Sequence, residues 1–304
     1  MLSGYFIPFF NNRTTARVVS WSMTLACTAF SIYISMDQPP LIRMIAITSI
    51  QLLTMKVIVL TETYKGKPKI SFFQWLAFAQ GWFGMRPALF EALISKPRSG
   101  VFYFVVKGFS RISMGIVLLI FSKLIRQELA STLFLLIGLS FILHFGILNV
   151  GTAFWRALGV DVKELFINPY RATSLKEFWG KRWNMAFSEM TALIVYKPLL
   201  SILGKQQAVV LSFLFSGILH EIAISFPVQS GYGLPLLYFA IHALVMYCES
   251  KIPFVQRITS HSALNHIWVM AWLILPLPLL FHKQFIIEVA RPLANTILQT
   301  IHLN

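Results

Sequence analysis

Long apolar runs separated by short charged segments dominate the chain. Seven of these runs are expected to cross the hydrocarbon core of a bilayer as helices. They are residues 18–36, 41–60, 101–122, 129–150, 207–227, 235–249 and 264–281. Two further apolar segments are ambiguous, because 72–85 is too short for a regular crossing and Lys197-Pro198 interrupts 188–203. The pattern predicts an all-α, polytopic membrane helical bundle with about seven to nine transmembrane or re-entrant helices.

Composition supports a membrane protein and excludes several other classes. The 304 residues are 57% hydrophobic and only 12% charged, unlike a soluble globular domain. The two cysteines, Cys27 and Cys248, lie inside apolar segments and offer neither a disulfide framework nor a cysteine-rich metal site. The C-terminal segment 285–301 is expected to be amphipathic and broken at Pro292. With no internal repeat and no removable signal peptide, we expect a single integral-membrane domain over 1–304.

The basic residues of the chain predict its orientation. A net charge of +15 would suggest nucleic acid for a soluble protein, but here Lys and Arg lie mostly in short loops beside apolar runs. The N-terminus, 61–100, 151–206 and 250–262 together hold 18 of them, against four in 123–128 and 282–304. The positive-inside rule therefore places 151–206 on the cytoplasmic face. We expect contact with the lipid bilayer and none with nucleic acid, in either the cell membrane or the endoplasmic reticulum.

Residues 168–184 pack charge, two tryptophans and an amide between apolar segments. Ser174 and Glu177 have capping-box spacing, so we expect a helix to begin here, with the Glu177 carboxylate reaching back to the N–H of Ser174. Beyond the cap, apolar residues recur at three- and four-residue steps, which predicts one amphipathic helix. They are Leu175, Phe178, Trp179, Trp183, Ala186, Phe187 and Met190. An interfacial anchor and a functional element explain this pattern equally well.

His220-Glu221 interrupts the apolar run 207–227 at a depth where ionisable groups are costly. On a helical wheel His220 shares a face with Ser212 and Ser216, which predicts that this face meets protein or a cavity. The pair indicates either a functional site or a histidine satisfied by an interhelical hydrogen bond. A zinc protease is excluded, because its spacing requires a second histidine at position 224, which is isoleucine.

Other polar residues in apolar segments are expected to be structural. His144 and His242 each stand without an acidic neighbour and are interpreted as core histidines. Glu249 lies at the end of an apolar run, where an ordinary solvated carboxylate is the default interpretation. No role in the chemistry is assigned to these residues.

The two informative stretches resemble the wax synthase branch of the membrane-bound O-acyltransferase superfamily. Leu165 to Asn184 is similar to that family's block of a proline, a small-residue pair, Ser-Leu, Phe-Trp-Gly, Arg-Trp and Asn, and Ser216 to Glu221 is similar to its second block. Flanking similarities are Trp82–Pro87, Leu143–Gly146, Gly151–Val162 and Gly231–Tyr238. Together they outline a wax synthase-like region over roughly 70–250. Lys181 stands where the family often has an arginine.

The resemblance implies acyl transfer from acyl-CoA, entering from the cytoplasm, to a long-chain or other lipophilic alcohol supplied by the membrane. It implies a reaction tunnel in which His220 and Asn184 meet, with acyl-CoA as co-substrate and neither a metal nor a cofactor. A buried neutral histidine suits a general base, so His220 is the candidate. Asn184 could polarise the thioester carbonyl or hold the imidazole tautomer, and the sequence leaves both roles open.

Further residues of the first block are candidates for binding acyl-CoA. Trp179 and Trp183 could shape the mouth of the tunnel. Four cations on the cytoplasmic side could contact the CoA phosphates, although positive-inside topology explains them equally well. These cations are Arg171, Lys176, Lys181 and Arg182.

Two other functions remain open at this point. One is an O-acyltransferase that acts on a small metabolite or glycan, because acceptor specificity depends on the width and lining of a tunnel. The other is a proton-coupled membrane transporter in which His220 and Glu221 relay protons. Transporters often have paired halves with broken helices, and the sequence shows no such internal symmetry.

Overall fold

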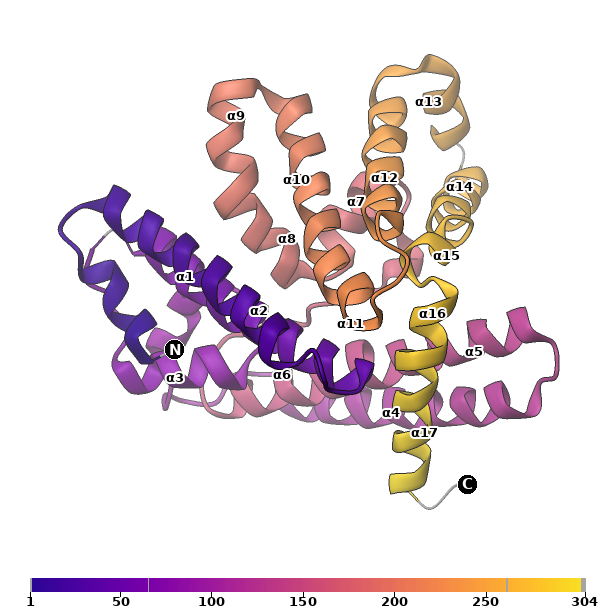
Figure 1. The fold of residues 1–304 in the computed structure, drawn as a ribbon, viewed down its shortest axis with the longest axis horizontal. Helices are drawn as coiled ribbons and strands as arrows, with labels where there is room; N and C mark the ends of the chain where they lie inside the picture. Colours follow the sequence, from indigo (N-terminus) through magenta and orange to yellow (C-terminus); the bar gives the residue numbers. More distant parts are fainter. Residues whose placement is uncertain (1, 65, 261, 302–304) are drawn as a thin grey trace. The chain divides into compact units, whose positions relative to one another are not determined.

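The computed structural model describes residues 2–64, 66–260 and 262–301 (Figure 1). Within these ranges every regular element is a helix, which confirms the predicted all-α class. Residues 65 and 261 lie in two segments expected at the cytoplasmic face and fall outside the described ranges.

Five helices of the described chain are long and apolar enough to cross a membrane, and a bent pair would make a sixth. They are Pro40–Thr63, Val101–Leu124, Glu128–Ala157, Met185–Leu203 and Lys205–Val228, with the pair Leu264–Leu280 and Lys283–Thr300 bent by 77°. The ambiguous segment 188–203 is therefore part of a membrane-capable helix. Two expected spans do not qualify: 18–36, which forms most of helix α1 (Arg13–Ile34), and 235–249, which lies in α12 (Leu234–Lys251). Its buried Ser20, Thr24 and Thr28 make α1 less apolar than the five helices that qualify.

The chain forms two compact units that interleave along the sequence. The first contains Met1–Phe30, Ser49–Leu165 and Ile286–Asn304, and the second contains Ser31–Thr48 and Phe166–Phe285. The candidate catalytic residues, Asn184 and His220, both lie in the second unit. The expectation of one integral-membrane domain stays a prediction.

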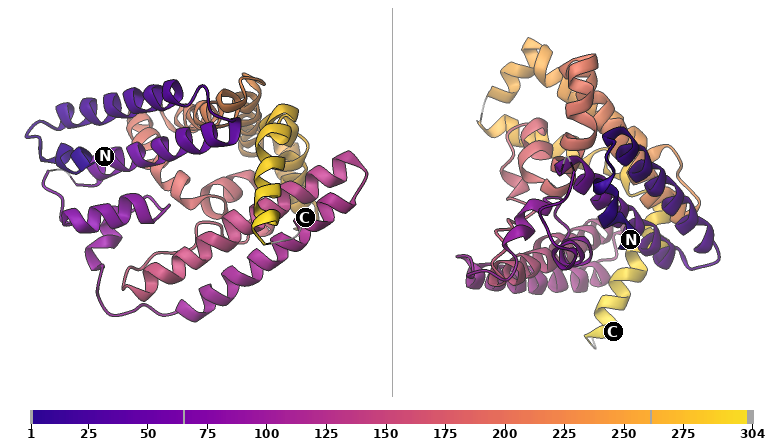
Figure 2. Two further views of the ribbon diagram at one scale, coloured as in Figure 1. Left: turned by 60° about the horizontal axis from the view of Figure 1, so that its bottom comes forward. Right: turned by 90° about the vertical axis from the view of Figure 1, so that its left-hand side faces the viewer.

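Helices packed through glycines form much of the first unit. Its elements after α1 are α2 (Pro40–Thr63, mostly in this unit), α3 (Phe72–Gly81), α4 (Val101–Leu124), α5 (Glu128–Ser140), α6 (Leu148–Ala157) and α17 (Arg291–Thr300). A π-helical segment at Phe141–Ile147 joins α5 to α6. A Cβ atom on Gly115 of α4 would lie 2.8 Å from the carbonyl oxygen of Gly138 on α5. Only glycine permits this close packing of α4 against α5, which Figure 2 shows side by side.

A buried lysine fixes the turn after α3. The Lys56 side chain on α2 is fully buried and donates to the carbonyl oxygens of Phe78, Trp82 and Gly84. Three carbonyl oxygens therefore surround the buried Nζ atom. The lysine inside an apolar span thus has structural partners.

Helix α17 contacts α4 and α5 at one end of their hairpin. Near the predicted break at Pro292 the helical run Lys283–Thr300 changes to a π-helical segment, Ile286–Ala290, and does not separate into two helices. Pro292 follows this segment in the first turn of α17, where a proline needs no backbone N–H donor.

The second unit holds the helices of the two informative stretches. They are α7 (Leu175–Glu177), α8 (Met185–Thr191), α9 (Lys197–Leu203), α10 (Lys205–His220), α11 (Phe226–Val228), α12 (Leu234–Lys251), α13 (Pro253–Ser260), α14 (Ser262–Ile274), α15 (Leu277–Leu280) and α16 (Lys283–Phe285). Gly204, with φ of 80°, turns the chain between α9 and α10. Helices α10 and α12 pack side by side (Figure 1). A Cβ atom on Gly217 would lie 2.7 Å from the Leu236 side chain, so the glycine allows this approach.

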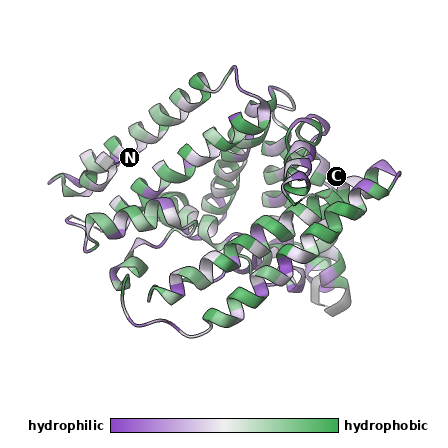
Figure 3. Ribbon diagram, turned by 90° about the horizontal axis from the view of Figure 1, so that it is seen from below, coloured by the Kyte–Doolittle hydropathy of each residue, from purple (hydrophilic) through white to green (hydrophobic). Residues whose placement is uncertain are grey.

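A small core joins α7 to α12 and α14. Its buried members are Ala172, Leu175, Phe178, Val245, Val269 and Leu273. Apolar residues also cover outward faces, as Figure 3 shows by hydropathy. Phe102 and Phe109 on α4, for example, are 80% and 58% exposed. Such faces suit contact with lipid.

Candidate functional site

His220 is the last residue of α10 and stands directly before a π-helical segment, Glu221–Ser225. Its Nδ1 lies 2.7 Å from the carbonyl oxygen of Ser216, one turn back on the same helix. Because a carbonyl oxygen only accepts hydrogen bonds, Nδ1 carries the hydrogen and Nε2 keeps its lone pair. The geometry therefore gives the basic nitrogen of a neutral imidazole at Nε2.

Two aromatic rings hold the imidazole in place. The Phe239 ring of α12 lies 4.4 Å from the His220 ring, centroid to centroid, and the Phe187 ring of α8 lies 5.9 Å away in an edge-on arrangement. Ser216, Phe187 and Phe239 thus surround His220 from three different helices.

Asn184 begins α8 in a left-handed backbone conformation, with φ of 44° and ψ of 65°. Asparagine adopts this conformation more readily than most residues. Its side-chain Oδ1 accepts a hydrogen bond from the backbone N–H of Phe187 at 3.2 Å. The single helix predicted from Leu175 to Met190 is therefore wrong, since α7 and a π-helical segment, Phe178–Arg182, end before Asn184 and α8 starts after it.

The structure connects Asn184 to His220 through Phe187. The Asn184 side chain fixes the backbone of Phe187, and the Phe187 ring contacts the imidazole. One of the two roles considered for Asn184, holding the imidazole tautomer, is filled by the Ser216 carbonyl. Capping uses Oδ1 and leaves the amide N–H groups as the part of Asn184 suited to another acceptor.

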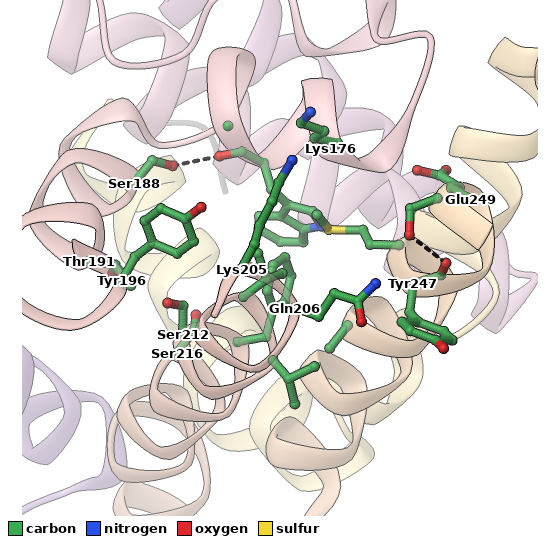
Figure 4. Close-up of a pocket in the computed structure, with 18 of the residues that line it drawn as sticks. Lys176, Ser188, Thr191, Tyr196, Lys205, Gln206, Ser212, Ser216, Tyr247 and Glu249 are labelled. Atoms are coloured by element: carbon green, nitrogen blue, oxygen red, sulfur yellow. Dashed lines mark hydrogen bonds between the residues drawn. The ribbon is translucent and has the colours of Figure 1, made fainter. Parts of the chain in front are cut away.

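A cavity of about 1130 Å³ lies among α7, α8, α10 and α12 (Figure 4). It follows α10 from Lys205 to Ser216 and α12 from Lys251 back to Phe239. Eleven helical residues correspond to a depth of about 16 Å. Lysines, glutamines and Glu249 line one end, and Phe187, Ser216 and Phe239, the three contact partners of His220, line the other. The cavity therefore leads from a polar end to the residues that hold the imidazole.

Three lysines line the polar end of this cavity, and we name them the lysine rim: Lys176, Lys205 and Lys251. Of the residues predicted to bind acyl-CoA, Lys176 and Trp179 line the cavity. Lys205 and Lys251 were not predicted. They stand at the start of α10 and the end of α12, and the short turn that joins the two predicted spans is the signal that could have placed both lysines at one end of the pair.

The other predicted binding residues lie outside the cavity lining. Arg171 sits over the Tyr170 ring at 5.8 Å, and Lys181 belongs to the π-helical segment. Trp183 stacks on Phe178 with ring centroids 5.5 Å apart. Arg171, Lys181 and Trp183 thus belong to the surroundings of the cavity.

Arg182 has an internal role in the structure. Its guanidinium donates to Glu177 at 2.7 and 2.9 Å and to the carbonyl oxygens of Ile167 and Asn168 at 3.3 Å. Because these bonds use four of its five N–H donors, Arg182 is placed to hold the segment before α7 rather than to meet a phosphate.

One of the two hydrogen bonds of the capping box predicted at the start of α7 is present. Ser174 accepts from the N–H of Glu177 at 3.1 Å, as expected. The Glu177 carboxylate reaches past Ser174 and accepts from the backbone N–H of Thr173 at 2.8 Å, so that half of the capping box is wrong. This bond, with the Thr173 hydroxyl and the Arg182 guanidinium, lowers the pKa of Glu177 to about 2.

Glu249 and Glu221 are structural partners of helix N-termini. Glu249 accepts from the backbone N–H of Leu175 at 3.1 Å and from the Trp268 indole at 3.0 Å, which corrects its interpretation as an ordinary solvated carboxylate. Glu221 accepts from the N–H of Gly233 at 2.8 Å at the start of α12. Both carboxylates anchor helices that line the cavity.

Two buried polar atoms on the cavity lining have no hydrogen-bond partner among the described residues. They are the indole Nε1 of Trp179 and the hydroxyl of Thr191. The Trp179 ring contacts Phe239 with centroids 5.5 Å apart, and Phe239 in turn contacts His220. An indole N–H donor therefore stands one ring away from the imidazole.

Comparison with known proteins finds similarity in the part of the chain that holds this site. Residues 162–241 match the model of the Membrane bound O-acyl transferase family. The chain is 31% identical over 140 residues to "Probable long-chain-alcohol O-fatty-acyltransferase 6" of Arabidopsis thaliana, a stretch that covers 40% of each chain. It is 37% identical over 73 residues to "Long-chain-alcohol O-fatty-acyltransferase" of Simmondsia chinensis, which covers 21% of each.

A third relative carries a different acceptor in its name. The chain is 39% identical over 70 residues to "Acyl-CoA--sterol O-acyltransferase 1" of Arabidopsis thaliana, 21% of this chain and 20% of that one. These similarities confirm the resemblance to the wax synthase-like branch of the superfamily. Each matched stretch spans two fifths of the relative's length or less.

Proposed function

We propose that the chain is a membrane acyl-CoA:alcohol O-acyltransferase that transfers a fatty acyl group to the hydroxyl of a long-chain or other lipophilic alcohol. The observation that carries this proposal is the His220 imidazole, whose Nδ1 is bonded to Ser216 and whose Nε2 is left basic, beside a long cavity with a lysine rim. The match of residues 162–241 and the names of the relatives support the reaction class.

His220 acts as general base in this proposal. Nε2 takes the proton of the acceptor hydroxyl while the hydroxyl oxygen attacks the thioester carbonyl carbon. The carbon–sulfur bond then breaks, and the imidazolium returns its proton to the departing thiolate. The products are the ester and free CoA thiol, so no other reactant is consumed.

A hydrogen-bond donor is needed to stabilise the negative charge that develops on the thioester carbonyl oxygen. The Asn184 amide N–H groups are one candidate, because Oδ1 is used in capping and Ser216 already sets the imidazole tautomer. The Trp179 indole is the other, because its buried N–H lines the cavity with no partner among the described residues. Both belong to the segment just before α8.

The lysine rim is proposed to hold the phosphates of acyl-CoA. Three ammonium groups at one end of the cavity give the positive charge that pyrophosphate requires. The residues along the cavity toward His220 include Val209, Val210, Phe213 and Ala243, which suit an extended aliphatic chain. Arg171 and Lys181, which lie outside the cavity lining, add to the positive electrostatic potential near the rim in this proposal.

The chain is further proposed to be a multi-pass protein with the lysine rim at the cytoplasmic face. The membrane-capable helices outside the predicted cytoplasmic segment 151–206 support several crossings, whereas Met185–Leu203 lies within that segment and is not counted as one. The ends of α10 and α12 that carry the rim lie in segments with the excess of Lys and Arg.

The acceptor class can be tested directly. Purified protein would be given labelled acyl-CoA and a panel of a fatty alcohol, a sterol, glycerol and a hexose, with ester products separated by mass. We expect esters of the fatty alcohol, with the sterol as the second acceptor to test because one relative is named for it. Products from the hexose alone would contradict the lipophilic acceptor, and no ester from any acceptor would contradict the acyltransferase assignment.

A further inference from the structure

A second cavity, of about 370 Å³, lies in the first unit at one end of the α4–α5 hairpin. The end of α4, the turn after it, the first turns of α5 and one face of α17 form its walls. Its lining residues are Ser122, Lys123, Ile125, Arg126, Glu128, Ser131, Leu135, Arg291, Ala294, Asn295 and Leu298. None of them belongs to the cavity beside His220.

Positive charge dominates this second cavity. Lys123, Arg126 and Arg291 line it with only one carboxylate, that of Glu128. Among the residues that the structure describes, none of the three cations has a carboxylate within 4 Å. The hydroxyls are already used, since Ser122 donates to the Leu119 carbonyl and Ser131 to the Ser122 carbonyl, each at 2.7 Å. The three cations and the Asn295 amide are thus the polar groups that could meet a ligand.

Membrane topology does not explain these cations. In the orientation set by the positive-inside rule, the segments 123–128 and 282–304 lie opposite the cytoplasm and hold only four Lys and Arg. Three of those four line this one cavity, and the fourth, Lys283, does not. A face with only one other cation in these segments concentrates three of them at a single hollow, which indicates an anion as the cause.

The floor of the cavity is apolar. Leu135, Ala294 and Leu298 are buried and lie on α5 and α17, below the charged residues of the helix ends. A free inorganic anion gains nothing from such a floor, whereas an amphiphile places its charged group at the cations and its hydrocarbon against the leucines. The volume is in the range of small-ligand sites and admits a headgroup.

We propose that this cavity binds the phosphate of an anionic phospholipid on the face that the positive-inside rule places opposite the cytoplasm, with Arg126 and Arg291 as its main ligands. Guanidinium groups bind phosphate oxygens in a bidentate manner, and Lys123 adds a third charge. The proposal does not depend on the acyltransferase reaction, because no residue of this site contributes to it.

The test compares lipid binding by the full chain and its variants. Full-length protein in detergent would be titrated with phosphatidylglycerol or phosphatidylcholine, and bound lipid would be measured by native mass spectrometry. We expect phosphatidylglycerol to bind more tightly. The double variant Arg126→Gln/Arg291→Gln should weaken that binding about thirtyfold, since each cation near a lipid surface contributes about 1 kcal/mol.

Lys283→Gln is the matched control, because it removes a cation of the same face that does not line the cavity. It should bind like the wild type, and an equal loss in both variants would overturn the site. Arg126→Lys/Arg291→Lys keeps the charge and should retain most of the binding. If the glutamine double variant does not fold, Arg291→Gln against Arg291→Lys gives the same comparison. Displacement of the lipid by millimolar inorganic phosphate would overturn the lipid in favour of a free anion.

Discussion

His220 and Asn184 each use one side-chain atom to fix local structure and keep another for chemistry. The His220 Nδ1 hydrogen is held by the Ser216 carbonyl, which leaves Nε2 basic. The Asn184 Oδ1 holds the N–H of Phe187, which leaves the amide N–H groups. A substitution that removes only one of the two functions can therefore separate fold from reaction.

Asn184→Asp is the first such substitution. The aspartate keeps the capping oxygen and tolerates the left-handed backbone, but it removes the amide donor. If that donor stabilises the developing oxyanion, turnover at saturating acyl-CoA should fall about a hundredfold while the thermal midpoint stays near that of the wild type.

Asn184→Ala is the companion variant. It loses the cap as well and places a Cβ residue at positive φ, so its stability should fall by about 1–2 kcal/mol. Full turnover in Asn184→Asp would make Asn184 a structural residue, and Trp179→Phe would then test the second candidate donor.

Glu177 gives a prediction about acid stability. Its bonds to Thr173 and Arg182 lower its pKa to about 2, below its ordinary value, so its contribution to stability is present above the ordinary value and is lost as pH falls toward 2. The thermal midpoint should therefore be flat for this group from about pH 5 to pH 8 and fall below about pH 4. Glu177→Gln should lower the free energy of unfolding at pH 7 by about 1 kcal/mol.

Asp37→Asn is the control for that measurement, because Asp37 is an exposed carboxylate at the tip of the α1–α2 hairpin. It should leave the midpoint unchanged at neutral pH. If the thermal midpoint of Glu177→Gln varied with pH as that of the wild type does, the bonds of Glu177 to Thr173 and Arg182 would not cause the acid sensitivity.

At the scale of elements, the cavity depends on where helices begin and end. Lys205 and Lys251 meet because α10 starts where the antiparallel α12 ends, and Lys176 joins them because Glu249 of α12 caps α7. The rim is thus built from three segments that are far apart in sequence.

Neutralising the lysine rim should affect one substrate. Lys205→Gln/Lys251→Gln should raise the Michaelis constant for acyl-CoA more than that for the alcohol, and added salt should weaken acyl-CoA binding less in the variant than in the wild type. Lys181→Gln is the matched control, since Lys181 belongs to the same basic stretch as Lys176 but does not line the cavity. Equal effects of both variants would mean that acyl-CoA is attracted by the overall positive charge of this face rather than by the lysine rim.

The sequence predicted the helices of this region better than their breaks. Ser174 correctly predicted the start of α7. The predicted polar face with Ser212 and Ser216 lines a cavity. The apolar stripe from Leu175 to Met190 gave no sign of the break at Asn184, because its residues are buried or half-buried on both sides of it. Left-handed asparagine and the bond from Ile167 N–H to the Arg182 carbonyl oppose the helical period there.

At the scale of the molecule, hydropathy predicted the all-α class, since apolar length alone identifies membrane-capable helices. It did not predict the two interleaved units, because neither composition nor periodicity reports which helices pack together. Lys176 could be proposed from local sequence, whereas the joint contribution of Lys205 and Lys251 to one cavity depends on the packing of α10 against α12. The roles of Arg182 and Glu249 depended on long-range partners in the same way.

Orientation can be measured with single cysteines in a Cys27→Ser/Cys248→Ser background. Cysteines introduced at Lys67 and at Tyr170, both exposed, should react with an impermeant thiol reagent from the cytoplasmic side. A cysteine at the exposed Tyr232 should react only from the other side. The reverse pattern would place the lysine rim on a face without CoA and would require another acyl donor.

The most direct test of the proposed reaction is the activity of His220→Ala and His220→Gln in purified, folded protein. Ester formation from labelled acyl-CoA and a fatty alcohol would be measured by mass, beside acyl-CoA binding and the thermal midpoint. The account predicts loss of ester formation by at least about a hundredfold in both variants, with acyl-CoA binding and the midpoint close to those of the wild type. Ester formation at the wild-type rate in a folded His220 variant would contradict it.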